Sequence, residues 1–387
     1  MIQVTAAGIC HTDLSVRDQL LATPLSAVLG HEGAGVVMSV GKGVSKVGPG
    51  DHVAMSYGYC GSCHNCQRGR PWICHDFGSC NSAGVRADGS TALTRGGQPI
   101  HSHFFSQSSF ATHAVATERN VTKLEPSLPL EIVAPFGCGF QTGAGAVLNA
   151  LRPEAGKSIA VFGTGAVGLA AVMAARVAGC TGIIGVDVRP SRLGLAQELG
   201  ATAVIDARAT DPVDAIKQAT GGVGVEFSIE ATGLPQVLGQ AVSSTAKGGI
   251  CVLLGAPPLG TEVSLEVHEI LGPARTLRGV IEGESVPEEF LPKLIDLWQQ
   301  GRFPVDQIIS LYDFDEINQA AHDAEEGRVG QTRPQDVTFA APRLAQGSHG
   351  LLRDPGPCQA YDPTCWLQQP RRRAPRVGDS QCCHLWR

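Results

Sequence analysis

The chain has 387 residues, more than one ordinary domain needs and enough for two. Hydrophobic residues make up 43% of it and charged residues 17%, a balance that can bury a core and excludes disorder for most of the chain. The formal net charge of −6 argues against a dedicated nucleic-acid binder. No apolar run reaches the roughly 18 residues of a membrane span, and the first residues lack the features of a secretory signal. We therefore expect a cytoplasmic protein with reduced thiols.

Two patterns divide the chain. Residues 1 to about 140 are rich in glycine, histidine and cysteine, and their short valine-rich segments (33–40, 51–57 and 109–116) predict a β-rich unit. From about residue 158, short apolar runs alternate with helical patterns, which predicts a parallel sheet covered by helices. Two further amphipathic helices are expected over 290–301 and 317–327.

The last part of the chain differs from everything before it. Residues 331–387 hold eight arginines but no lysine, glutamate or isoleucine, and they show no periodicity. We predict a disordered, solvated extension. The alternative is that the arginine run at 371–373 forms a basic patch for a partner.

Four cysteines fall within fifteen residues: Cys60, Cys63, Cys66 and Cys74. Reduced thiols at this spacing can converge on one tetrahedral ion, and a zinc site with four protein ligands is structural because it has no open position. Four unliganded thiols or an iron–sulfur cluster are the alternatives. His64 and His75 lie beside the cluster, but the four thiols already complete the coordination.

A second set of ligand types is scattered along the chain. Cys10, His31 and Cys138 each lie in or beside a glycine-containing turn, and together they supply two thiolates and one imidazole. Two cysteines and one histidine form the catalytic zinc set of alcohol dehydrogenase, with the fourth position open for water or substrate. Asp13 and Glu32 would then be carboxylates that orient these ligands from behind. Taken singly, each of these residues could be an ordinary structural cysteine, cap or surface charge.

The sequence Gly163-Thr164-Gly165-Ala166-Val167-Gly168 follows an apolar strand and opens a helix, and Asp187 ends the next strand. This context makes it a dinucleotide-binding fingerprint, with the pyrophosphate at the helix N-terminus. The Asp187 carboxylate can accept hydrogen bonds from the ribose and repels a 2′-phosphate, which favours NAD over NADP. The nearby Arg189 and Arg192 weaken that preference.

With these motifs the chain resembles the zinc-dependent alcohol dehydrogenases of the medium-chain dehydrogenase/reductase superfamily. The resemblance covers residues 4 to 328 and rests on GICHTD, GHEGAG, CGSCHNC, PFGCG and the glycine fingerprint. Residues 8–25, 101–116 and 271–283 look most like the aryl-alcohol (benzyl alcohol) dehydrogenases. The chain is short before GICHTD compared with the family, and its last segment is atypical.

The resemblance implies an α/β fold in two domains. A GroES-like β-barrel catalytic domain would comprise 1–141 and 283–330, with a zinc lobe at about 57–76. A Rossmann domain that binds NAD would comprise 142–282, and 331–387 would be the tail.

The resemblance also implies the role of each site residue. Cys10, His31 and Cys138 would hold the catalytic zinc, the four clustered cysteines would hold the structural zinc, and Thr12 would take the proton of the substrate alcohol. The implied cofactor-binding residues are His11, Thr142, Gly163, Gly165, Val167, Gly168, Asp187 and Arg192. Ser15 stands where many relatives have a histidine at the end of the proton relay. Tyr57 could form an aromatic wall for the substrate or could be simple packing.

The expected reaction is oxidation of a primary, benzyl-type alcohol to the aldehyde and the reverse, by hydride transfer from a zinc alkoxide. The implied partners are a small alcohol or aldehyde and further copies of the chain in a homodimer or homotetramer, with neither nucleic acid nor membrane. Three alternatives remain: another medium-chain alcohol or formaldehyde-adduct dehydrogenase, an inactive remnant that binds zinc and NAD, and a zinc-ribbon module that binds nucleic acid through the basic tail.

Overall fold

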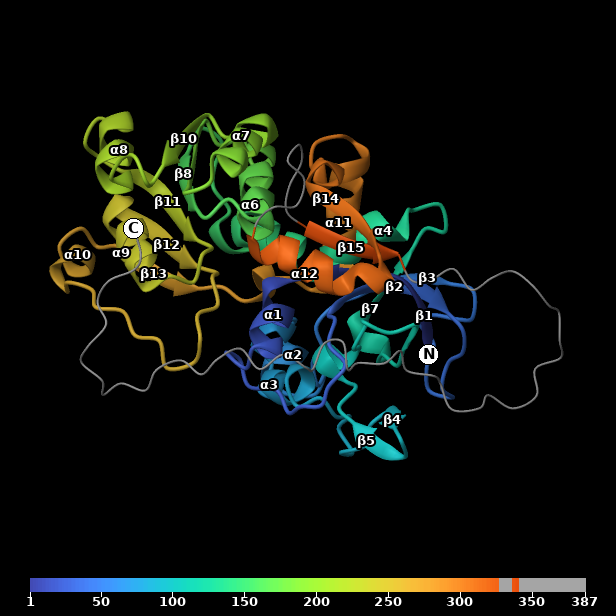
Figure 1. The fold of residues 1–387 in the computed structure, drawn as a ribbon. Coiled ribbons are helices and arrows are strands. Elements are labelled where there is room, and N and C mark those ends of the chain that lie inside the picture. Colours follow the sequence, from blue (N-terminus) through green and yellow to red (C-terminus); the bar gives the residue numbers. More distant parts are fainter. Residues whose placement is uncertain (327–335, 341–387) are drawn as a thin grey trace.

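The computed structural model describes residues 1–326 and 336–340. Two large sheets lie in separate parts of the molecule, and Figure 1 shows the parallel sheet with its helices at upper left and the barrel-like sheet at lower right. Within these described residues, no helix has the length and apolar character required to cross a membrane.

The first sheet has seven mostly short strands, and most of their pairings are antiparallel. Valine, isoleucine and alanine alternate with small residues in these strands, which suits a pleated surface that is buried on at least one face. The strands, in sheet order, are β14 (Ile309–Asp313), β15 (Asp336–Ala340), β1 (Ile2–Ile9), β2 (Glu32–Val37), β3 (His52–Met55) and β7 (Val121–Leu124), with β6 (His113–Ala114) paired to β1.

The prediction of a disordered extension over 331–387 is wrong for part of that segment. Residues 336–340 form β15, which pairs antiparallel with β1 and parallel with β14. The segment DVTFA contains valine, threonine and phenylalanine, which favour strands, and it lies beside an otherwise open edge. The remainder of the expected tail, with the arginine run at 371–373, lies outside the described residues.

The second sheet is parallel throughout, as the alternation of apolar runs and helical patterns predicts. Its order is that of the dinucleotide-binding folds, with a switch point between β8 and β11 where ligands bind. In sheet order the strands are β10 (Ala203–Asp206), β9 (Gly182–Asp187), β8 (Ser158–Phe162), β11 (Val225–Glu230), β12 (Thr245–Leu253) and β13 (Thr276–Gly279).

Helices connect these strands and link the two parts of the molecule. The helix α8 begins after Asp211, whose carboxylate accepts hydrogen bonds from the backbone of Val213 and Asp214, as an N-cap should. The helices used below are α1 (His11–Arg17), α2 (His64–Gln67), α3 (Phe77–Asn81), α5 (Gly139–Gly145), α6 (Ala166–Val177), α7 (Pro190–Leu199), α8 (Pro212–Ala219), α9 (Pro235–Ser244), α11 (Pro287–Gln299) and α12 (Ile317–Glu326).

One hydrophobic core extends across both parts. It runs from Ala34 of β2 through Phe140 of α5 to Leu169 of α6 and Val161 of β8, and all four side chains are fully buried. Burial of a large apolar side chain contributes about 1.5–3 kcal/mol, so this shared core holds the two sheets at a fixed distance. Cys138, a predicted metal ligand directly before α5, is thereby tied to the glycine loop before α6.

Candidate functional site

The two cysteines and the histidine singled out in the sequence meet in space. Cys10 follows β1, His31 directly precedes β2, and Cys138 caps the N-terminus of α5. Their ligand atoms all lie within 4.8 Å of one another. Three soft or borderline ligands at this separation can hold one zinc ion.

Asp13 fixes the orientation of His31 in this group. Its fully buried carboxylate accepts hydrogen bonds from the backbone N–H groups of Cys10 (3.1 Å) and Gly30 (3.0 Å), and lies 3.0 Å from Nδ1 of His31. Nε2 of His31 is buried and has no hydrogen-bond partner among the described residues. A buried polar atom without a partner is costly, so this nitrogen fits a site completed by a metal ion.

The charges of the group also suit a cation. The pKa of Cys10 lies well below its ordinary value because the Cys138 thiol donates a hydrogen bond to the Cys10 thiolate, and for the same reason the pKa of Cys138 is raised. Burial lowers the pKa of His31, but the charge and hydrogen bond of Asp13, together with Cys10, more than offset it, so that pKa is raised well above its ordinary value. The group therefore concentrates negative charge at a buried point.

Glu32 lies beside the three predicted ligands. The sequence predicts that its carboxylate orients them from behind, and in the structure one of its oxygens lies within 4.8 Å of the ligand atoms of Cys10, His31 and Cys138. Oε1 of Glu32 accepts a hydrogen bond from the backbone N–H of Gly139 at 2.8 Å, and the side chain is nearly inaccessible to solvent. A carboxylate oxygen therefore lies among the candidate ligand atoms, beside the two thiols and the imidazole.

The residues between Cys10 and Asp13 begin α1. Oγ1 of Thr12 lies 3.7 Å from Sγ of Cys10, within reach of a group bound beside that sulfur. His11 is exposed at the first helical position, and Ser15 lies one turn further along, partly buried.

The four clustered cysteines also converge. Their sulfur atoms all lie within 4.8 Å of one another, and two of the separations, Cys60–Cys66 and Cys63–Cys74, are 4.0 Å. The edges of a tetrahedron of sulfurs around zinc are about 3.8 Å, given bonds of about 2.3 Å. The backbone N–H of Cys66, followed by that of His75, lowers the pKa of Cys63 to about 6. The set fits a closed zinc site, and His64 instead lies 3.3 Å from Arg68.

The glycine fingerprint forms the turn between β8 and α6. Gly163 has a φ of +87°, and a Cβ on Gly168 would lie 1.8 Å from the carbonyl oxygen of Gly163, so neither position accepts a side chain. Oδ2 of Asp187 accepts a hydrogen bond from the backbone N–H of Thr164 at 2.8 Å. The structure thus brings the carboxylate to the glycine turn, with Arg192 at 3.9 Å from it.

Thr142 and Val167 lie on helices in close contact. A Cβ on Gly143 would lie 2.0 Å from the carbonyl oxygen of Val167, so α5 and α6 touch through their backbones at this point. Thr142 also donates its backbone N–H to the carbonyl of Cys138. The predicted nicotinamide contacts and the metal ligands are therefore neighbours.

Two further features of this site, a pair of phenylalanines and a buried glutamate, were not predicted from the sequence. Phe105 lies against His31 with 4.5 Å between ring centroids, and Phe104 meets the same imidazole edge-on at 5.6 Å. Glu282 is buried, accepts a hydrogen bond from Gln141, and has its pKa raised to about 8 by burial. The two adjacent phenylalanines in HSHFFSQ could have been predicted as an aromatic part of the site. No motif around Glu282 in the sequence indicates that this residue is buried at the site.

Tyr57 is fully buried, and its hydroxyl donates to the carbonyl of Ser285 at 2.6 Å. Its ring lies near those of Tyr59 and Phe77. Of its two interpretations, packing is the one that the structure favours.

Comparisons with known proteins identify the families and structures that the chain resembles. The alcohol dehydrogenase GroES-like domain family matches residues 1–126, and the zinc-binding dehydrogenase family matches residues 166–300. The chain is 44% identical to a geraniol dehydrogenase of Castellaniella defragrans over 85% of this chain and 88% of that protein. Two crystal structures are similar over 88% of this chain and 91% of theirs. One is an alcohol dehydrogenase zinc-binding domain protein from Burkholderia ambifaria (49% identity, TM-score 0.85), and the other is the benzyl alcohol dehydrogenase from Acinetobacter calcoaceticus (46%, 0.83).

Proposed function

Since the chain belongs to the zinc-dependent alcohol dehydrogenases of the medium-chain dehydrogenase/reductase superfamily, we propose that it oxidises a primary, benzyl-type alcohol to the aldehyde with NAD, and catalyses the reverse reaction. The observation that carries this proposal is the group of Cys10, His31 and Cys138, with Asp13 behind the imidazole and a buried, unpartnered Nε2 in front of it.

Two zinc ions and one NAD molecule would complete the protein, and the donor sets fit all three. Cys10, His31 and Cys138 would hold a catalytic zinc, the four lobe cysteines a structural zinc, and the glycine turn with Asp187 an NAD molecule. When bound, the zinc would supply Lewis acidity that lowers the pKa of the alcohol, and NAD would accept the hydride.

The chain's own residues have separate tasks in this reaction. Thr12 would accept the hydroxyl proton of the alcohol at Oγ1 and release its own hydroxyl proton to water at the exposed start of α1. Asp13 keeps His31 in one tautomer, with Nε2 facing the cluster. Thr142 and Val167 hold the nicotinamide against the cluster, because their helices cannot separate without breaking the shared core.

The aromatic character of the proposed substrate rests on Phe104 and Phe105. Their rings pack against the imidazole of His31, so an apolar surface borders the metal ligands. Offset and edge-on contacts between aromatic rings contribute about 0.5–1.5 kcal/mol beyond simple burial. A benzylic alcohol can make such contacts, and a short aliphatic alcohol cannot.

A substrate panel with zinc-replete enzyme tests the proposal. We expect kcat/KM for benzyl alcohol with NAD to exceed that for ethanol, and NAD to be preferred over NADP because Asp187 repels a 2′-phosphate. Binding of NAD without turnover of any alcohol in the panel would identify an inactive remnant instead.

A second substrate has its own support. The relative from Castellaniella defragrans is a geraniol dehydrogenase, and an allylic alcohol resembles a benzylic one in having its hydroxyl beside a π-system. The same panel decides between them, because a larger kcat/KM for geraniol than for benzyl alcohol would favour the allylic class.

The edge of the parallel sheet favours a homodimer or homotetramer. Among the residues that the structure describes, β13 pairs only with β12, and Leu277 in this strand and Ile281 just after it are exposed to 37% and 44%. A second copy that pairs with this edge would cover it. Light scattering coupled to size-exclusion chromatography should give two or four times the mass of the chain, and a monomer at micromolar concentration would contradict this assembly.

A further inference from the structure

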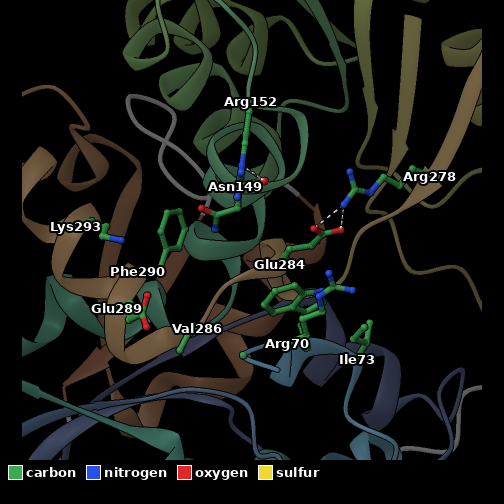
Figure 2. A pocket seen from close by; sticks show the side chains of 12 residues that line it. Arg70, Ile73, Asn149, Arg152, Arg278, Glu284, Val286, Glu289, Phe290 and Lys293 are labelled. Atoms are coloured by element: carbon green, nitrogen blue, oxygen red, sulfur yellow. Dashed lines mark hydrogen bonds and ion pairs between the residues drawn. The ribbon is translucent and has the colours of Figure 1, made fainter. Parts of the chain in front are cut away.

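A cavity of about 550 Å³ lies away from the metal cluster and the glycine turn. It is bounded by the loop after α2, by the end of the π-helix Ala146–Leu151, by β13 and by the first turns of α11. Figure 2 shows Lys293 and Arg278 on opposite sides of this cavity, with Arg152 above. Neither the metal ligands nor the cofactor residues named above line it. Its volume is in the range of small-molecule sites.

Positive charge dominates the lining of this cavity. Arg70, Arg152, Arg278 and Lys293 face two carboxylates, one of which, that of Glu284, is fully engaged with Arg278 through hydrogen bonds of 2.5 and 2.6 Å. Within the described part of the chain, neither Arg70 nor Lys293 takes part in an ion pair. Four cations and two carboxylates leave this concave surface with a net positive charge, which attracts an anion.

Backbone carbonyls fix the positions of two of these cations, Arg278 and Arg152. Arg278 also donates to the carbonyl of Ala150 at 3.1 Å, and Nε of Arg152 donates to the carbonyl of Asn149 at 2.8 Å. Arg152 has a φ of +50°, a left-handed conformation, directly after the π-helix. Both features are unfavourable in an ordinary chain and occur preferentially at functional sites.

Apolar side chains complete the lining. Trp72 and Ile73 come from the lobe and Phe290 from α11. A ligand that satisfies both kinds of surface carries its charges at the periphery and an apolar frame in the middle. Guanidinium groups recognise carboxylates and phosphates through paired hydrogen bonds, and tryptophan presents a flat apolar face.

We propose that this cavity is a binding site for a small organic dianion, in which two acidic groups stand on an aromatic or apolar frame. The site shares no residue with the metal cluster or the glycine turn and is independent of the proposed dehydrogenase reaction. Arg278 comes from β13, whose edge the proposed second copy would cover, so binding is measured on the assembled oligomer. Arg70 and Lys293 bind the acidic groups, Arg278 is the third cation, and Trp72 and Phe290 contact the frame.

The test uses benzene-1,3-dicarboxylate as the probe. The zinc-replete, full-length protein is saturated with NAD, so that the glycine turn is not open to the probe, and binding is measured by isothermal titration calorimetry at constant ionic strength. We expect saturable binding with one site per chain. The double variant Arg70→Gln/Lys293→Gln should weaken it by about tenfold or more, since each change removes a charge-assisted hydrogen bond.

The matched control removes the same charge elsewhere. Arg68 lies on the same lobe and Lys247 is exposed on β12, and neither lines the cavity. Arg68→Gln/Lys247→Gln should leave the Kd of the probe unchanged, and benzoate, with one carboxylate, should bind more weakly than the dicarboxylate. Three results would overturn the proposal: no saturable binding, equal weakening in both double variants, or displacement of the probe by the substrate alcohol.

Discussion

The Asp13 carboxylate accepts hydrogen bonds from two backbone N–H groups and faces Nδ1 of His31, all inside a fully buried environment. Replacing it by asparagine keeps the size but leaves a neutral group that can no longer hold the imidazole as strongly. Loss of such a supporting carboxylate typically costs 10–100-fold in metal affinity, so we expect Asp13→Asn to lower zinc affinity at the cluster by about that factor.

Competition with a chelator, followed by elemental analysis, measures this loss for each site. The four-cysteine lobe should keep its zinc in the same samples, because Asp13 does not contact it. The control is Asp296→Asn, an exposed position on α11, which should leave both sites filled. Loss of zinc from both sites in Asp13→Asn would mean that the variant unfolds and not that one ligand is misplaced.

Glu282 gives a prediction about pH. Burial raises its pKa from 4.5 to about 8, so the folded chain holds a proton that the unfolded chain releases between those values. Stability contributed by the protonated carboxyl is therefore present in full below about pH 4.5 and is lost as the pH rises toward 8. Each pKa unit is worth about 1.4 kcal/mol, which makes the total a few kcal/mol.

The variant Glu282→Gln removes this dependence while it keeps a side chain that can pair with Gln141. In protein stripped of metal, since a bound cation would itself lower the pKa of a nearby carboxyl, the melting temperature of the variant should exceed that of the wild type most at pH 8–9. Equal pH profiles for the two proteins would show that Glu282 ionises freely in the folded state.

Asp13 and Glu282 show which parts of the site could be predicted from the sequence and which could not. Cys10, His31 and Asp13 could be chosen because their types are those of a metal site, and a resemblance supplied their roles. Glu282 could not, because its place beside the cluster depends on a chain reversal in which Glu282, Gly283 and Glu284 all have positive φ. Glutamate is rare in that conformation, so local propensity gives no warning of it.

Among the secondary-structure elements, β15 is another feature that the sequence alone does not predict. It pairs with the last residues of β1, from Ala6 to Ile9, and Cys10 follows immediately. Its strand-forming residues are visible in the sequence, but its partners lie at the other end of the chain, where only tertiary structure brings them together. The strand therefore supports the segment that carries Cys10, the first of the predicted metal ligands.

Two truncations test this support. Deletion of 341–387 keeps β15, whereas deletion of 327–387 also removes it and leaves unpaired hydrogen-bonding groups along β1 and β14. We expect the longer deletion to lower the melting temperature and the zinc content more than the shorter one. Indistinguishable values for the two proteins would show that β15 does not stabilise the cluster.

At the scale of the whole molecule, backbone contacts hold the predicted metal ligands beside the glycine turn of the parallel sheet. The helix α5 begins at Cys138 and touches α6 at Gly143, where a Cβ would lie 2.0 Å from the carbonyl oxygen of Val167. An ion pair between Arg17 and Glu325 and a hydrogen bond from Arg189 to the carbonyl of Glu325 add a second link through α12. The distance between the reacting groups is thus set mainly by backbone contact.

Gly143→Ala should therefore separate the two helices while it leaves every metal ligand and cofactor contact in place. A misplacement of about 1 Å can cost about a hundredfold in rate, so we expect kcat to fall at least tenfold with zinc content unchanged. Gly239→Ala is the matched control, because that helical glycine of α9 has no atom within 4 Å of the added methyl group, and alanine there should be neutral or slightly stabilising. Unchanged kcat in Gly143→Ala, at full zinc occupancy, would mean that the shared core adjusts without moving the cluster relative to the cofactor turn, and that the contact at Gly143 serves packing alone.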